Sequence, residues 1–204
     1  MRHILLSASI LLIAISAYGQ TDSPSQPCRL KFSQAPEVRG VKLGMTVDEL
    51  LPLFPGSSDS GGIKHALSSA EGYPHFGEGQ FGISPSNWGN KERFAGINGY
   101  YFHLFDRRVM GLTVQYMSFP DGPRWQNPDD LIQRFSESLH LPGPKEWAPA
   151  PGDNNSRKLK CDGFEVSVTA GDQSSIRFYA SSWEGTRRER IAAFDEQKRR
   201  EFKP

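Results

Sequence analysis

Residues 40–56 decide the fold, and their sequence is Gly-Val-Lys-Leu-Gly-Met-Thr-Val-Asp-Glu-Leu-Leu-Pro-Leu-Phe-Pro-Gly. Thr46 followed by Glu49 is a capping-box pattern: the threonine hydroxyl accepts from the amide of Glu49, and the glutamate carboxylate accepts from the amide of Thr46. Apolar side chains then recur at i, i+3 and i+4, so a helix that begins at this box has one apolar face. Pro52 lies inside the apolar run and lacks an amide donor, which predicts that the helix is short or kinked.

The same pattern recurs later in the chain. Residues 46–54 and residues 127–135 each contain an N-cap residue, two acidic residues in the first turn, an aliphatic pair and a final Phe. Pro128 suits the first position of a helix. Two interpretations stay open: a tandem duplication of a helix-plus-hairpin unit, or the likeness that any two capped amphipathic helices share.

Alternating apolar and polar residues predict strands after both helices. The expected strands are residues 97–105, 109–117, 157–161, 164–169 and 174–180, with another near residues 80–83. Asp162-Gly163 between two of them is typical of a type I′ hairpin turn. The predicted fold class is therefore α+β: a twisted antiparallel sheet of roughly five to seven strands, packed by two short helices.

The expected domain organisation follows from these patterns. Residues 57–95, rich in Gly, Ser and Asn, and the proline-rich residues 142–152 are expected to be connections, and Leu30 and Phe32 could form a strand. The charged C-terminal helix either lies solvated on the sheet or binds a partner or an anionic surface. The predicted units are a signal peptide at 1–19, a flexible segment at 20–38, an α+β domain at 39–182 with possible subunits 39–119 and 124–182, and the C-terminal helix at 183–204.

Residues 1–19 are typical of a secretory signal peptide. Arg2 gives a basic start, residues 4–15 are an apolar run, and Ala17 and Gly19 form a small-x-small cleavage site. The apolar run is shorter than the roughly 20 residues that span a bilayer. We expect an exported protein, periplasmic or extracellular, without a transmembrane segment after removal of the signal. The formal net charge of +1 does not indicate nucleic acid as a partner.

The chain has two cysteines, Cys28 and Cys161. In an exported protein an even number of cysteines is compatible with a disulfide, which would tie the mature N-terminus to a late strand. The alternative is two free, unrelated thiols.

Motifs of known chemistry are absent from the sequence. It contains no G-x-S-x-G, no Walker loop, no H-E-x-x-H and no C-x-x-C, so no catalytic or cofactor-binding residue is predicted. Residues 77–82 match G-x-G-x-x-G, but proline-containing segments flank them where the fingerprint needs a strand and a helix. His65, Glu71 and His75 lie close together, yet their spacing fits no template for a metal site, and none is predicted.

Aromatic residues are dense in the polar segment that follows the first helix. Tyr73, Phe76, Phe81 and Trp88 are candidate partner-binding residues, because protein interfaces favour aromatic anchors. The alternative is that they hold this segment against the sheet. The solvent face of the sheet is the second place where we expect a binding surface.

The motif Gly-x-x-Leu-Gly-Met-Thr-x-x-Glu-Leu at residues 40–50 resembles that of two related families. These are the β-lactamase-inhibitory-protein-like domains and the small outer-membrane assembly lipoproteins of the SmpA/OmlA family. The resemblance implies a short helix packed on an antiparallel sheet and a non-catalytic, protein-binding function, with an envelope or secreted protein as partner. Cys28 follows Ser-Gln-Pro rather than a lipobox, so no lipid anchor is expected. The alternative function is a secreted hydrolase whose site shows no sequence motif.

Overall fold

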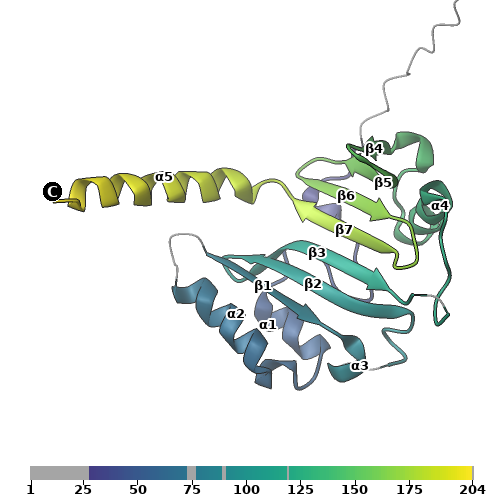
Figure 1. The fold of residues 1–204 in the computed structure, drawn as a ribbon, viewed down its shortest axis with the longest axis horizontal. Helices are drawn as coiled ribbons and strands as arrows, with labels where there is room; N and C mark the ends of the chain where they lie inside the picture. The colour runs from purple at the N-terminus through teal and green to yellow at the C-terminus, as the bar shows by residue number, and fades with distance from the viewer. Residues whose placement is uncertain (1–27, 73–76, 89–90, 119, 204) are drawn as a thin grey trace, which may run out of the picture.

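The computed structural model describes residues 28–72, 77–88, 91–118 and 120–203 (Figure 1). The predicted signal peptide and residues 20–27 of the predicted flexible segment lie outside these residues. The strands are β1 (Glu78–Ile83), β2 (Ile97–Phe105), β3 (Arg108–Tyr116), β4 (Ala148–Ala150), β5 (Asp153–Lys160), β6 (Phe164–Thr169) and β7 (Ser175–Ala180). The helices are α1 (Val47–Leu50), α2 (Gly61–Gly72), α3 (Pro85–Trp88), α4 (Pro128–Leu139) and α5 (Trp183–Glu201). Short 3-10 turns are η1 (Phe32–Gln34), η2 (Leu51–Leu53), η3 (Ser57–Asp59) and η4 (Pro144–Glu146).

All seven strands form one antiparallel sheet in the order β1-β2-β3-β7-β6-β5-β4. The predicted α+β class is confirmed, and the two helix-plus-hairpin units share a single sheet. In the first unit, α1 precedes the meander β1–β3; in the second, α4 precedes the meander β5–β7. The last strands of the two meanders, β3 and β7, pair antiparallel and join the units. This symmetric topology is what a tandem arrangement of two such units produces.

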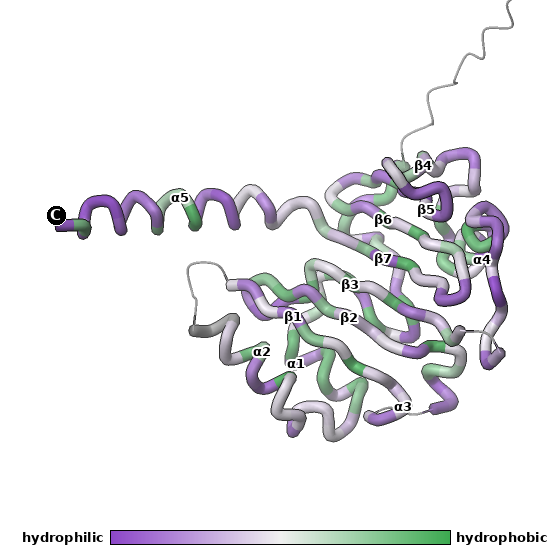
Figure 2. The backbone as a smooth tube through the Cα atoms, viewed as in Figure 1, coloured by the Kyte–Doolittle hydropathy of each residue, from purple (hydrophilic) through white to green (hydrophobic). Residues whose placement is uncertain are grey.

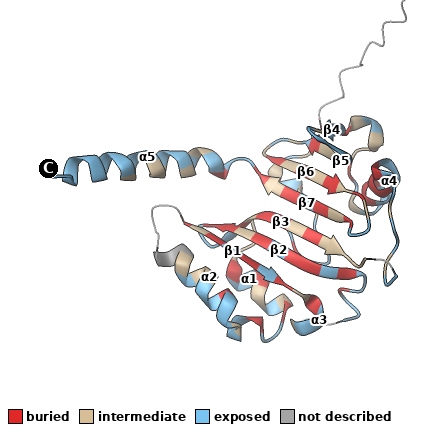
Figure 3. Ribbon diagram, viewed as in Figure 1, coloured by how far each residue is buried: buried red, intermediate tan, exposed pale blue. Residues whose placement is uncertain are grey.

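Helices α1, α2 and α4 cover one face of the sheet. On the continuation of α1, Phe54 is fully buried, and its ring lies 5.5 Å from the ring of Tyr100 and 6.4 Å from that of Phe102, both on β2. On α4, Phe135 lies 5.3 Å from the ring of Tyr116 on β3, which faces the same side as Tyr100. Apolar side chains at alternate strand positions therefore fill one core, and burial alternates along β2, β3, β6 and β7 (Figure 3).

Both predicted helix starts are confirmed. Thr46 and Glu49 form the capping box: the hydroxyl accepts from the Glu49 amide at 3.2 Å, and the carboxylate accepts from the Thr46 amide at 2.8 Å. Asn127 accepts from the amide of Asp129 at 3.0 Å. The first helix is short, as Pro52 requires, because α1 gives way to the 3-10 turn η2 after one turn.

Three predictions of irregular or extended backbone are wrong. Residues 57–95 are not a bare connection, because they contain α2 and α3 besides β1, the strand expected near residues 80–83. Glycine and serine lower the intrinsic helix propensity of α2, and burial of Ile63 against the core offsets that deficit. Residues 142–152 contain η4 and β4, and Phe32 starts the 3-10 turn η1 rather than a strand.

The turn chemistry also differs from the prediction. A type I′ turn needs positive φ at both central residues. At Asp162-Gly163 only the glycine has positive φ, 85°, although the predicted hairpin between β5 and β6 forms. Between β2 and β3, by contrast, Asp106 and Arg107 have φ of 48° and 58°. The turn that resembles type I′ is therefore Asp106-Arg107, which contains no glycine.

Cys28 and Cys161 form a disulfide across 133 residues of sequence. It joins the start of the described chain to the residue that follows β5. A disulfide of this kind fits an oxidising compartment and export from the cytosol.

Helix α5 leaves the end of β7 and extends away from the sheet, rather than lying on it (Figure 1). Its first turns contact the sheet through Trp183, Arg187 and Arg190. Beyond these residues the helix is largely exposed and hydrophilic along its length (Figures 2 and 3).

Candidate functional site: the open face of the sheet

The face of the sheet opposite α1, α2 and α4 carries polar and aromatic side chains. We refer to it as the open face. Strand pairing places its residues in two rows across the sheet: Tyr101, Thr113, Arg177, Ser167 and Lys158 in one, and Gln80, His103, Gly111, Tyr179 and Glu165 in the other. No side chain of either row belongs to the buried hydrophobic core.

Glycines beneath the aromatic rings of the open face leave room for the rings to lie against the backbone. A Cβ atom on Gly82 would lie 3.3 Å from the Tyr101 ring, and one on Gly99 would lie 3.7 Å from it. A Cβ atom on Gly111 would meet the Cβ of His103 at 2.9 Å and the Tyr179 ring at 3.4 Å. Glycine in a strand interior costs stability, and it is tolerated where a close approach needs it.

Tyr101 is the most exposed aromatic side chain of this face. It is 51% exposed, and only it and Phe202 are large hydrophobic side chains with high exposure in the described part of the chain. Tyr and Arg are among the residue types that dominate binding hot spots. The guanidinium of Arg177 lies 5.0 Å from the centre of the Tyr179 ring, a cation–π arrangement. The open face therefore presents a partly aromatic surface with a cation beside it.

The base of α5 forms a wall at one end of the open face. The Trp183 ring lies 4.9 Å from the His103 ring and 5.2 Å from the Phe105 ring. Arg187 pairs with Glu78 of β1, and two guanidinium nitrogens of Arg190 donate to Asp106, each at 2.7 Å. A hollow of about 460 Å³ lies between α5 and the sheet.

His103 and Glu78 in this hollow are the natural place to look for acid–base chemistry. Their closest atoms, Nε2 and Oε2, are 4.0 Å apart, which is too far for a hydrogen bond. Burial lowers the pKa of His103 below its usual value, and the carboxylate of Glu78 offsets only part of this effect. Gln80 contacts Nδ1 at 3.1 Å, and no serine, threonine or cysteine is among the described residues that line the hollow. The pair contacts the base of α5, His103 through Trp183 and Glu78 through Arg187.

Tyr179 shares the hollow and is fixed by α5. Its hydroxyl donates to the Glu184 carboxylate at 2.9 Å. Burial and this carboxylate raise the Tyr179 pKa to about 12, so the phenol stays neutral at physiological pH.

The structure separates the four aromatic residues predicted to bind a partner. Tyr73 and Phe76 lie outside the described residues. Phe81 is buried in β1, with its ring 5.2 Å from that of Phe102, so it belongs to the core and is not available to a partner. Trp88 is half-buried over Gly56. The positions of Phe81 and Trp88 fit the alternative interpretation, that aromatic residues hold this segment in place.

The sequence predicts the solvent face of the sheet as a binding surface but does not single out its residues. Tyr101 stands between Tyr100 and Phe102, and three aromatic residues in a row hide the alternation that separates core from surface. The signal that could have found Tyr101 is Gly82 opposite it on β1, because a strand glycine often marks a close approach.

The described residues were also searched for groups of metal-binding side chains and for helices able to cross a membrane. Within the described residues, no group of three or more His, Cys, Asp and Glu side chains is placed to hold a metal ion. None of the helices in this part of the chain combines the length and the apolar character that a membrane crossing requires.

Comparison with known proteins finds no similar protein. No family model, no curated protein and no solved structure matches this chain.

Proposed function

We propose that this protein is an exported, non-enzymatic binding or inhibitor-like module that holds another protein against the open face of its sheet. The observation that carries the proposal is the half-exposed Tyr101 on a face otherwise made largely of polar side chains. Protein interfaces are enriched in Tyr, Trp and Arg around such anchors.

The charges of the open face suggest what the partner offers. Lys158 and Glu165 neutralise each other at 3.1 Å, whereas Arg177 contacts an aromatic ring and has no ion pair within the described residues. A partner carboxylate is the matching group for an arginine that is free to form a bidentate pair. The resemblance of residues 40–50 to inhibitory-protein-like domains and outer-membrane assembly lipoproteins supports an envelope or secreted protein as the partner.

The disulfide supports the compartment, because such bonds persist in oxidising surroundings. The alternative is a secreted hydrolase that uses His103 and Glu78. In that alternative His103 would act as general base on the water molecule that attacks the substrate, and replacement of His103 by Gln would abolish hydrolysis of ester, peptide or glycoside test substrates.

The test compares two exposed aromatic residues. Purified protein is immobilised, exposed to a native envelope fraction, and the captured protein is identified and its Kd measured. Tyr101→Ala should weaken binding by about 30-fold, which corresponds to about 2 kcal/mol for an interface hot spot.

The matched control is Phe202→Ala, which removes the other highly exposed aromatic residue at the end of α5. Non-specific adhesion would respond to both substitutions, and binding by the open face responds to Tyr101→Ala alone. Unchanged Kd values for Tyr101→Ala and Arg177→Gln would refute the proposal.

A further inference from the structure

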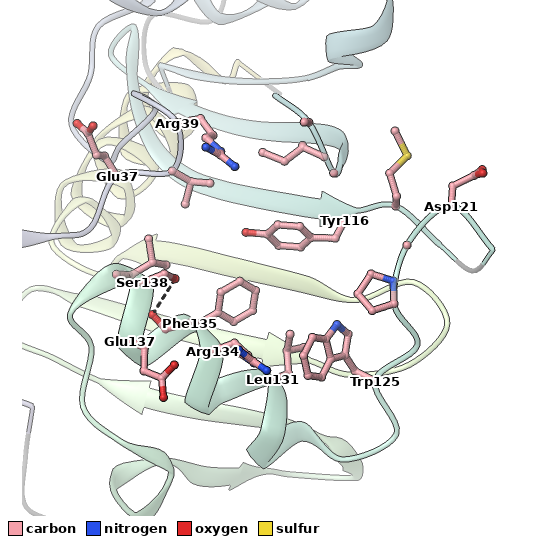
Figure 4. A pocket seen from close by; sticks show the side chains of 18 residues that line it. Glu37, Arg39, Tyr116, Asp121, Trp125, Leu131, Arg134, Phe135, Glu137 and Ser138 are labelled. Atoms are coloured by element: carbon pink, nitrogen blue, oxygen red, sulfur yellow. Dashed lines mark hydrogen bonds between the residues drawn. The ribbon is translucent and has the colours of Figure 1, made fainter. Parts of the chain in front are cut away.

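A groove on the covered side of the molecule lies between the two helix-plus-hairpin units (Figure 4). Its volume is about 830 Å³, within the range of small-molecule sites, which are mostly apolar with a few placed polar groups. Apolar and aromatic side chains from both units line it: Ile97, Tyr116, Trp125, Leu131, Phe135 and Leu139.

One end of the groove is polar. The Tyr116 hydroxyl has no hydrogen-bond partner in the described part of the chain, and its oxygen atom is not fully buried. It is therefore open to the groove. Burial raises the Tyr116 pKa to about 12, so the hydroxyl remains a neutral donor at physiological pH.

Arg39 lies at the same end. Its positive charge acts on the phenols of both Tyr100 and Tyr116, and in Figure 4 its side chain extends towards the Tyr116 ring. Among the described residues Arg39 has no ion-pair partner.

The backbone at Arg39 is unusual for such a residue. Its φ is 57°, in the left-handed region that non-glycine residues avoid, and the next residue, Gly40, has φ of 89°. The Arg93 side chain donates to the Arg39 carbonyl at 3.1 Å, and the Tyr100 hydroxyl donates to the Val38 carbonyl at 3.3 Å. The core thus fixes a turn that costs energy and presents an arginine, a pattern that points to function.

The acidic residues of the groove lie at its edges. In Figure 4 the carboxylates of Glu37, Asp121 and Glu137 turn away from the Tyr116 and Phe135 rings. Arg134, which also has no ion pair within the described residues, lines the groove beside Leu131. Of the charged residues that line the groove, Arg39 is the one whose charge acts on the Tyr116 phenol.

We propose that this groove binds an amphiphile with a single alkyl chain and one anionic group. The chain lies along Phe135, Leu131 and Trp125, and the anionic group accepts hydrogen bonds from the Tyr116 hydroxyl and the Arg39 guanidinium. The site is separate from the open face and does not depend on the function proposed for that face.

The test uses two probes of equal chain length and opposite charge, below their micelle concentrations. Dodecanoate should bind the purified protein one to one in calorimetry and change the fluorescence of Trp125. Dodecyltrimethylammonium should bind at least about tenfold more weakly, because its head group lacks the charge that Arg39 attracts. A single-chain phosphate lipid forms a third arm: tighter binding than dodecanoate identifies a membrane lipid as the source, and weaker binding identifies a free long-chain carboxylate.

Variants assign the polar end. Tyr116→Phe removes the hydroxyl and keeps the ring on Phe135, and it should weaken dodecanoate binding about tenfold, as expected for a hydrogen bond to a charged group. Arg39→Gln should have an effect of similar size, whereas Tyr101→Phe on the open face is the matched control and should have none.

Equal affinity for the two head groups would overturn the proposal. So would unchanged dodecanoate affinity in Tyr116→Phe. If Arg39→Gln does not fold, Tyr116→Phe and the head-group comparison still decide the question.

Discussion

Removal of the disulfide should strongly destabilise the folded protein, because the bond closes a very long loop. Cys28 and Cys161 are 133 residues apart. In the chain-entropy model, opening a loop of that length returns about 5 kcal/mol of conformational freedom to the unfolded state at 25 °C. The expected effect of the double substitution Cys28→Ser and Cys161→Ser is therefore a loss of up to about 5 kcal/mol in the free energy of unfolding.

Urea unfolding followed by tryptophan fluorescence measures this change. With a urea dependence of about 2 kcal/mol/M for a chain of this size, the midpoint should fall by about 2.5 M. The unsubstituted protein in reducing agent is the control, and its midpoint should match that of the double variant. A fall of less than about 0.5 M in both samples would show that the long loop is already constrained in the unfolded chain, and the entropic reasoning would be wrong.

Three further outcomes are expected from the core, the first helix and the hollow. Phe54→Ala should cost about 3–5 kcal/mol in urea unfolding because a fully buried ring is removed from contact with three other rings, and a cost below about 1 kcal/mol would contradict that packing. Thr46→Ala should cost about 1 kcal/mol through loss of the cap, and Thr46→Ser should restore most of it. Burial lowers the pKa of His103 in the folded protein below the ordinary histidine value near 6.5. Between these two pKa values His103 binds a proton more readily in the unfolded chain than in the folded protein. The free energy of unfolding should therefore fall as the pH drops from about 6.5 towards the folded pKa. His103→Gln should flatten this pH dependence, whereas His65→Gln, at an exposed position, should leave it unchanged.

Local signals predicted the helix starts and most of the strands. The Thr46–Glu49 box and Asn127 act over three or four residues, and the structure forms both caps as expected. The hairpin strands follow from alternation, which depends only on the period of an extended chain. The disulfide was one of two alternatives that the sequence left open, because spacing cannot show which residues the fold brings together.

Other elements needed contacts between distant residues. Helix α2 begins with Gly61 and Gly62 and ends at Gly72, and glycine does not favour a helix. It forms because Ile63 reaches the core.

The I′-like turn at Asp106-Arg107 lacks glycine. Arg190 of α5 holds Asp106, and Asp48 of α1 holds Arg107 at 3.1 Å.

The sequence by itself determined the α+β class, the two capped helices and the antiparallel hairpins, since each depends on residues close together in the chain. Only the tertiary structure decided that β3 pairs with β7, and with it the open face that carries Tyr101 and the groove that carries Tyr116. The physical reason is that a strand's pattern specifies which side is apolar but not which strand lies beside it. A surface made of several strands exists only once that pairing is fixed.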